Sequence, residues 1–167
     1  MQRNLMFMYD SNFIINYTVK NEPHHKLAFG IHNLIKNKCP EYKIIIPSIV
    51  YNETITTLFT KTTNIEKIRK ICSNFQESKN VINFPINEIS TFGLLKTLSD
   101  EGYFKNALNS HRKMRTSDTL IACSAKQLNA YLLSFDIPFY DQLSTVYDKI
   151  YDCTKTSEIK RLLTNIS

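Results

Sequence analysis

Four carboxylates could carry chemistry: Asp10 and Asp136 each follow a predicted strand, Asp118 stands at a predicted helix start, and Glu53 lies within the helix after the second strand. Asp10 directly follows the apolar run from Leu5 to Tyr9, and Asp136 follows a second short apolar run. Carboxylates that gather at one edge of a sheet repel one another, and a divalent cation relieves that repulsion. Mg²⁺ prefers a few carboxylates, several waters and phosphate oxygens as ligands. Metal-assisted chemistry on a phosphate group is therefore what these four side chains could do together.

Each of the four acids also has an ordinary structural role open to it. Asp10 or Ser11 could cap the helix that follows, and Asp118 could be an acid favoured by the dipole at a helix start. Asp136 could be a turn residue, and Glu53 could lie on the solvated face of its helix. The functional interpretation therefore rests on the four acids as a set.

The second half of the chain contains a helix and a strand that would bring two of these acids together. Apolar residues at helical spacing follow Asp118, and the apolar run 130–135 is typical of a buried strand that ends at Asp136. Ala122 and Ala125 share a helical face with Asp118, so this helix can lie close to the sheet. We expect Asp118 and Asp136 to meet at one edge of the sheet.

The remaining elements alternate between strand and helix, which favours a mainly parallel sheet covered by helices on both faces. We expect a turn with Pro138 after Asp136, and no repeat or linker divides the chain, so residues 1–167 are predicted to form one domain. Apolar runs predict strands at 5–9, 43–46, 81–84, 130–135 and 149–151. Helical spacing predicts helices at 13–17, 21–39, 48–55, 65–75, 86–98, 103–108, 118–128 and about 159–163.

Composition narrows the function classes. Only three glycines occur among 167 residues, which excludes glycine-rich phosphate loops. The four cysteines form no CxxC pair, which excludes a zinc ribbon and favours reduced thiols in the cytoplasm. The N-terminal apolar run is too short for a signal peptide or a membrane span, so no membrane association is expected. The net charge of +6 weakly favours a polyanionic partner.

Four segments of the chain, in order, resemble the motifs of the PIN-domain family of metal-dependent nucleases. The resemblance spans most of the chain, and it is similar to the VapC-type ribonuclease toxins, which are compact single-domain members of the family. The matching segments are the strand that ends in Asp10-Ser11-Asn12, the helix from Pro47 to Glu53, the segment from Ser117 to Ala122, and Leu133-Ser134-Phe135-Asp136 followed by Phe139.

This resemblance implies an α/β fold with three layers (α/β/α) and about five strands in the order 3-2-1-4-5. Strands one and four would then be neighbours, and Asp10 and Asp136 would flank a crevice where open α/β sheets usually bind ligands. Asp10 and Asp118 would be the principal ligands of Mg²⁺ or Mn²⁺. Asp136 would be a further ligand, and Glu53 would bind the metal or orient the attacking water.

Further residues would support these four acids. Ser134 stands where such proteins often carry threonine, and its hydroxyl could hydrogen-bond a ligand or a carboxylate. Ser11 and Asn12 adjoin the first acid, and Asp141 is a rival to Asp136 as the fourth acid. The basic cluster at 111–115 precedes Asp118, and within it we expect RNA phosphate contacts from Arg112, Lys113 and Arg115.

The resemblance thus predicts a metal-dependent endoribonuclease, either a toxin restrained by an antitoxin or a free-standing RNA-processing enzyme. A homodimer is expected by resemblance alone. The alternative is a PIN-like module that binds RNA or protein without cleaving. Receiver domains and haloacid-dehalogenase-type phosphatases fit poorly, because Ser11 and Asn12 stand where those proteins place a second acid.

Overall fold

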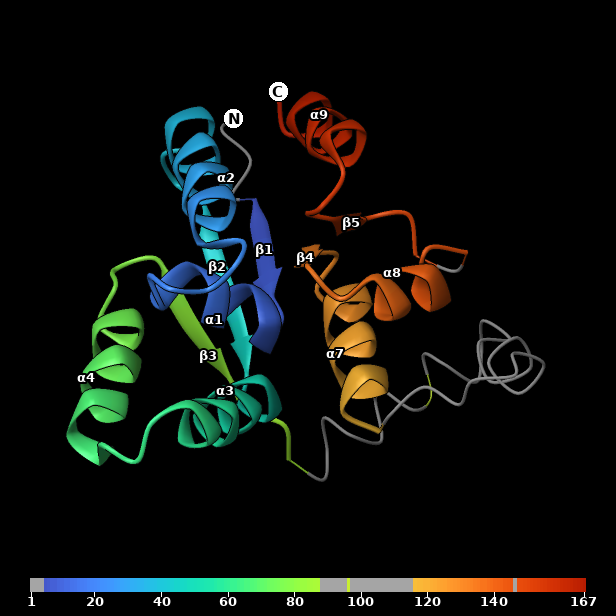
Figure 1. Cartoon of the computed structure of the whole chain (residues 1–167). Helices are drawn as coiled ribbons and strands as arrows, with labels where there is room; N and C mark the ends of the chain where they lie inside the picture. The colour runs from blue at the N-terminus through green and yellow to red at the C-terminus, as the bar shows by residue number, and fades with distance from the viewer. Residues whose placement is uncertain (1–4, 88–95, 97–115, 146) are drawn as a thin grey trace.

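The structure, a computed structural model, describes residues 5–87, 96, 116–145 and 147–167 (Figure 1). Five parallel strands form one sheet in the order β3-β2-β1-β4-β5, which confirms the predicted fold class and strand order. The strands are β1 (Met6–Tyr9), β2 (Lys43–Pro47), β3 (Val81–Phe84), β4 (Tyr131–Ser134) and β5 (Ile150–Asp152). The described helices are α1 (Ser11–Thr18), α2 (His25–Lys38), α3 (Ser48–Lys61), α4 (Ile65–Gln76), α7 (Thr116–Gln127), α8 (Ile137–Leu143) and α9 (Thr156–Asn165).

The central strand β1 reads as an uninterrupted apolar run because both of its faces are covered. Phe7, Met8 and Tyr9 have no exposed surface, and Phe7 pairs with Ile44 of β2 on one side and with Tyr131 of β4 on the other. Parallel strands covered on both faces carry continuous rather than alternating hydrophobicity. The position of β1 in the middle of the sheet fixes where the residue after it, Asp10, must lie.

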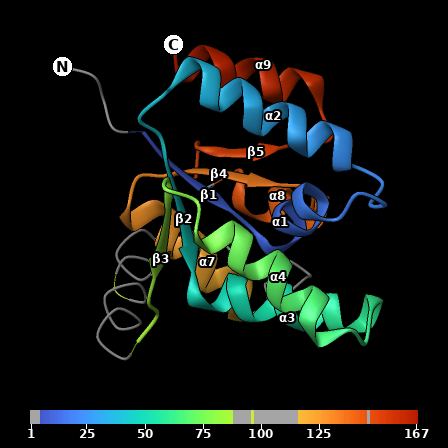
Figure 2. The same cartoon turned by 90° about the vertical axis from the view of Figure 1, so that its left-hand side faces the viewer.

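Helices α2 and α9 cover the same face of the sheet and run side by side (Figure 2). On that face, Tyr9 Oη lies 3.1 Å from His32 Nδ1 of α2, and the guanidinium of Arg161 in α9 lies 4.1 Å from the ring centre of Tyr151. The connection from β1 to β2 crosses the sheet in one direction, and the connection from β3 to β4, which contains α7, crosses it in the opposite direction. Because both crossovers are right-handed, α7 lies on the face opposite to α2.

The two acids that follow β1 and β4 each cap the next helix. Asp10 Oδ1 accepts a hydrogen bond from the Phe13 amide at 2.6 Å, and Asp136 Oδ1 accepts one from the Phe139 amide at 3.1 Å. The predicted turn after Asp136 is wrong, because residues 137–143 form α8 with Pro138 in its first turn. Proline is tolerated there, where its missing amide hydrogen has no intrahelical partner.

Two other sequence predictions differ from the structure or lie outside it. Ile86 and Asn87 are not helical, so the helix predicted for 86–98 does not begin there, and the Ile86 amide instead donates to Ser48 Oγ. The rest of that helix, apart from residue 96, and the helix predicted for 103–108 lie outside the described residues. None of the described helices is long and apolar enough to span a membrane.

Candidate functional site

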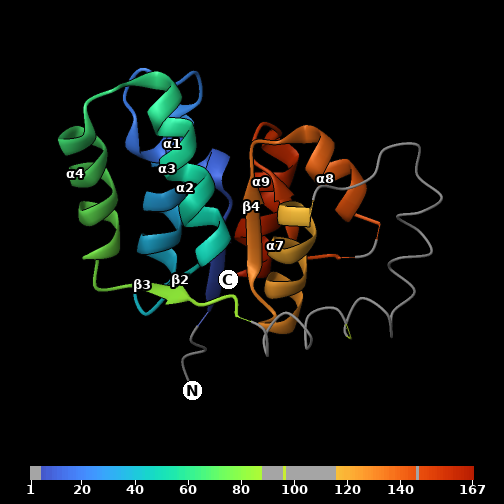
Figure 3. The same ribbon diagram turned by 90° about the horizontal axis from the view of Figure 1, so that it is seen from below.

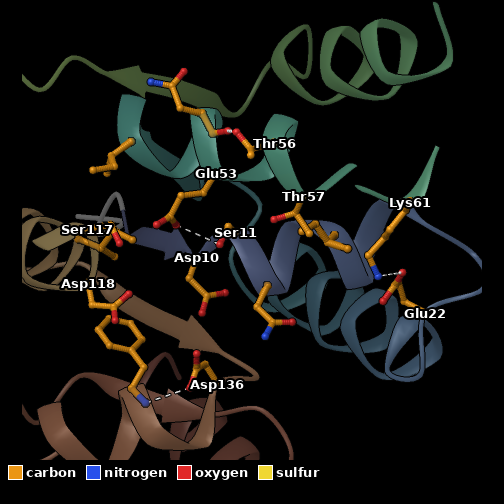
Figure 4. Close-up of a pocket in the computed structure, with 16 residues that line it drawn as sticks. Asp10, Ser11, Glu22, Glu53, Thr56, Thr57, Lys61, Ser117, Asp118 and Asp136 are labelled. Atoms are coloured by element: carbon orange, nitrogen blue, oxygen red, sulfur yellow. Dashed lines mark hydrogen bonds and ion pairs between the residues drawn. The ribbon is translucent and has the colours of Figure 1, made fainter. Parts of the chain in front are cut away.

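A cleft of about 650 Å³ opens at the carboxyl ends of β1 and β4 (Figure 4). Helices α3 and α7 contact each other, and the view from below shows α7 beside β4 and α3 on the side of β2 (Figure 3). The side chains around the cleft come from α1, α3, α7 and α8 and from the loops before α1, α2 and α8: Asp10, Ser11, Asn12, Ile15, Glu22, Ile49, Asn52, Glu53, Thr56, Thr57, Lys61, Ser117, Asp118, Ile121, Asp136 and Phe139.

Asp10 is the most buried acid of the cleft, with 4% of its surface exposed. Its pKa is raised from 3.8 to about 7. Burial is the largest cause, hydrogen bonds from Ser134 and from the Phe13 amide oppose it, and the charges of Asp136 and Asp118 raise the pKa further. The protein thus holds Asp10 where its carboxylate is costly to ionise without a nearby positive charge.

Ser134, which is fully buried at the end of β4, joins two of the acids. Its hydroxyl donates a hydrogen bond to Asp10 Oδ2 and accepts one from the Asp136 amide at 2.8 Å. This bridge exists because β1 and β4 are neighbours in the sheet, with Tyr9 in register with Leu133. The predicted contact between Ser134 and a carboxylate is therefore present in the structure.

The other acids approach from helices on either side of Asp10. Glu53 comes from α3, and its Oε2 accepts a hydrogen bond from Ser11 Oγ at 3.2 Å. Asp118, in the first turn of α7, and Asp136, before α8, are half-buried and close enough to raise the pKa of Asp10. Small side chains on the inner face of α7 allow this helix to lie close to the sheet, since its residues Ala122 and Ala125 are buried in the core.

The structure thus gathers six of the predicted residues around one cleft and places Ser134 beneath them. Asp141 is exposed on α8 and is not among the described residues that line the cleft. Three predicted phosphate contacts lie outside the described residues: Arg112, Lys113 and Arg115. The six gathered residues are Asp10, Ser11, Asn12, Glu53, Asp118 and Asp136.

Sequence reasoning missed the other end of the cleft. Thr57 and Lys61 follow Glu53 at intervals of four residues, so they share one face of α3, and Glu22 approaches Lys61 from the loop before α2. That spacing was visible in the sequence. Glu22 gave no such signal, because its place beside Lys61 depends on the path of the loop.

The donor set around the cleft fits a hard divalent cation in its chemistry. Carboxylate oxygens are the ligands that Mg²⁺ and Mn²⁺ favour. Burial first, and the neighbouring acids second, raise the pKa of Asp10, and a bound cation would offset both by stabilising the carboxylate. In the described part of the chain, however, no three His, Cys, Asp or Glu side chains are close enough to hold one metal ion as they stand.

No protein-family model matches this chain, and no curated protein does. Solved structures do match. VapBC-1 from nontypeable Haemophilus influenzae superposes with a TM-score of 0.60 and 26% identity, over 90% of this chain and 100% of that chain. VapBC2 from Rickettsia felis, bound to a promoter DNA fragment, superposes with a TM-score of 0.61 and 19% identity, over 83% of this chain and 93% of that chain. This chain has a VapC-like PIN-domain fold.

The VapC-like fold is shared with a toxin whose target is stated. VapC20 from Mycobacterium tuberculosis, described as a toxin that cleaves the sarcin-ricin loop, superposes with a TM-score of 0.58 at 14% identity. It covers 81% of this chain and 93% of its own. The likeness to VapC20 is one of fold, and the acids of this chain must be judged on their own geometry.

Proposed function

We propose that this protein is a metal-dependent endoribonuclease of the VapC type. The observation that carries the proposal is the convergence of four acids from separate elements on one cleft, around the buried Asp10 with its pKa near 7. A buried acid whose neighbours are also acids is typical of a site that receives a cation. The similarity to VapC20, a toxin that cleaves RNA in the sarcin-ricin loop, supports RNA as the substrate.

Asp10 and Asp118 would hold Mg²⁺ or Mn²⁺, with Asp136 as a further ligand. The bound ion would supply a more acidic water and would stabilise charge on the scissile phosphate. Ser134 acts through Asp10, because its hydroxyl fixes the carboxylate and links it to the Asp136 amide. Glu53, hydrogen-bonded to Ser11, stands on the opposite wall and would orient the attacking water.

The protein's role is expected to be that of a toxin with an antitoxin partner. The solved VapBC structures and FitAcB from Neisseria gonorrhoeae, which superposes with a TM-score of 0.54 at 14% identity, support this part of the proposal. The antitoxin would block access of RNA to the cleft. Co-expression with a small neighbouring protein that binds this chain and suppresses its activity would identify that partner.

The decisive experiment is an RNA cleavage assay with the purified protein and a panel of single-stranded, hairpin and ribosomal RNAs. We expect cleavage with Mg²⁺ or Mn²⁺, none with EDTA, and a loss of about a hundredfold or more in Asp10→Asn and Asp118→Asn. Asp141→Asn is the matched control, because that acid is exposed on α8 outside the cleft lining. It should cleave like the wild type, whereas Asp136→Asn should not.

Equal behaviour of the wild type and both cleft variants would contradict the nuclease proposal, provided that any co-purified inhibitor had been removed by denaturation and refolding. A protein that then still bound RNA would be the non-cleaving PIN-like module. Activity lost in Asp141→Asn but retained in Asp136→Asn would reverse the assignment of the fourth acid.

A further inference from the structure

The cleft has two chemically different ends, which are joined by one face of α3. At one end stand the acids around Asp10. At the other end stands Lys61, which lies on the same face of α3 as Glu53, with Thr57 between them (Figure 4). Lys61 lies eight positions after Glu53, so an α-helix places the two residues about 12 Å apart along its axis. That distance is longer than a single phosphate group, and it suits an RNA strand that extends beyond the bond to be cleaved.

Among the described residues that line the cleft, one is basic, Lys61, and five are acidic. A polyanion that enters such a cleft meets repulsion unless cations contact its phosphates. Lys61 is 40% exposed, so its ammonium is open to solvent and to a ligand. Its position at the far end of α3 separates it from Glu53 and from the acids around Asp10, and the acid that it pairs with is Glu22.

Glu22 holds this lysine in place. Lys61 Nζ lies 2.5 Å from Glu22 Oε1, and the Glu22 carboxylate is the more buried partner, with 14% of its side chain exposed. An ammonium group has three N–H donors, so the pair leaves donors of Lys61 available to another anion. The same carboxylate also repels an arriving phosphate. Glu22 thus favours RNA binding by positioning Lys61 and disfavours it by its own negative charge.

We propose that Lys61 is a substrate-positioning residue that binds a backbone phosphate of the RNA strand, on the α3 side of the scissile bond. This inference rests on the proposed function. Thr57, in the described lining, offers a hydroxyl group to the sugar-phosphate backbone between the two ends, whereas the hydroxyl of its neighbour Thr56 donates to the Asn52 carbonyl. Contacts of this kind set the register of the strand and add affinity without reading its sequence.

The test measures binding of a fluorescein-labelled single-stranded RNA in EDTA, by fluorescence anisotropy over a range of salt concentrations. Lys61→Gln should weaken binding about fivefold and reduce the salt slope by about 0.7. Glu22→Gln should strengthen binding about twofold, because it removes a repelling charge. Lys160→Gln is the charge-matched control, since Lys160 is exposed on α9, which packs on the α2 face of the sheet.

The opposite signs expected for Lys61→Gln and Glu22→Gln separate a phosphate contact from a structural ion pair. If both variants weaken binding equally, the pair only ties α3 to the loop before α2, and the proposal is overturned. It is also overturned if Lys61→Gln behaves like Lys160→Gln while the wild type binds and cleaves RNA, a result that leaves the proposed function intact. A wild type that neither binds nor cleaves RNA overturns both proposals.

Discussion

Two buried aspartates, Asp10 and Asp152, stand at the carboxyl ends of two strands of the same sheet, yet the charged groups beside them have opposite signs. Asp10 follows β1 and is 4% exposed, and Asp152 ends β5 and is 1% exposed. By position and burial alone the two would be judged alike. Their partners decide what each does.

Asp152 is paired with its own neighbours in the chain. Its Oδ1 accepts hydrogen bonds from the Thr154 amide at 2.9 Å and from the Thr154 hydroxyl at 2.6 Å. Lys155 Nζ lies 3.0 Å from Oδ2 and forms an ion pair with it. Burial raises the pKa of Asp152, but the hydrogen bonds from Thr154 and the charge of Lys155 outweigh burial, and the pKa is lowered.

Asp10 has hydrogen-bond donors but acids for charged neighbours, and its pKa moves in the opposite direction. A buried carboxylate with its own cation stabilises the fold, whereas one surrounded by carboxylates stores repulsion that an external cation can relieve. The comparison therefore separates an acid that is paired within the fold from one that we propose to receive a cation. Four predictions test it, from the largest expected effect to the smallest.

The first prediction concerns stability against pH in EDTA. Because the pKa of Asp10 is raised from 3.8 to about 7, its contribution to the free energy of unfolding is fully present below pH 4 and is lost as pH rises through 7. The shift corresponds to at most about 4 kcal/mol. Urea unfolding between pH 5 and 8 should show the wild type losing stability relative to Asp10→Asn. Parallel pH curves for the two proteins would contradict the prediction.

The second prediction concerns stabilisation by Mn²⁺ at pH 8. A site in the native state alone stabilises it by about 2.7 kcal/mol when the free ion is at a hundred times its Kd. We expect thermal unfolding to show this gain in the wild type and in Asp152→Asn, but not in Asp10→Asn. An equal gain in all three would place the bound ion away from Asp10.

The third prediction concerns the bridge made by Ser134. Ser134→Ala leaves Asp10 Oδ2 and the Asp136 amide without this partner, which should cost about 1–3 kcal/mol in urea unfolding. Ser124→Ala is the matched control, because Ser124 is equally buried but its hydroxyl bonds only the Leu120 carbonyl within α7. Equal losses in the two variants would show that the bridge has no special role.

The fourth and smallest effect is expected for Asp152→Asn. The asparagine can still accept from Thr154, so the change removes only the charge that faces Lys155. Because the pKa of Asp152 is lowered, its stabilising contribution is present above pH 4 and is lost as pH falls through the native pKa. Urea midpoints of the wild type and the variant should converge at low pH. A gap that widens as pH falls would contradict this assignment.

The sequence by itself determined the order of the five strands and the places of the acids along the chain. The uninterrupted run before Asp10 predicted a central strand because residues covered on both faces have no reason to alternate. Asn129 marked the end of α7, and it adopts φ 53°, a left-handed conformation that asparagine tolerates. These signals are local, and each is read within a few residues of the element it specifies.

Only the tertiary structure decided which side chains meet. Ser134 reaches Asp10 across 124 positions of sequence because β1 and β4 are neighbours, and strand order is a property of the whole sheet. The predicted turn at Pro138 became α8, which turns Asp141 to solvent while Asp136 stays in the cleft. Lys61 likewise meets Glu22, 39 positions away in the sequence, only because the loop before α2 passes beside α3. Such contacts depend on long-range packing, which no local window of the sequence contains.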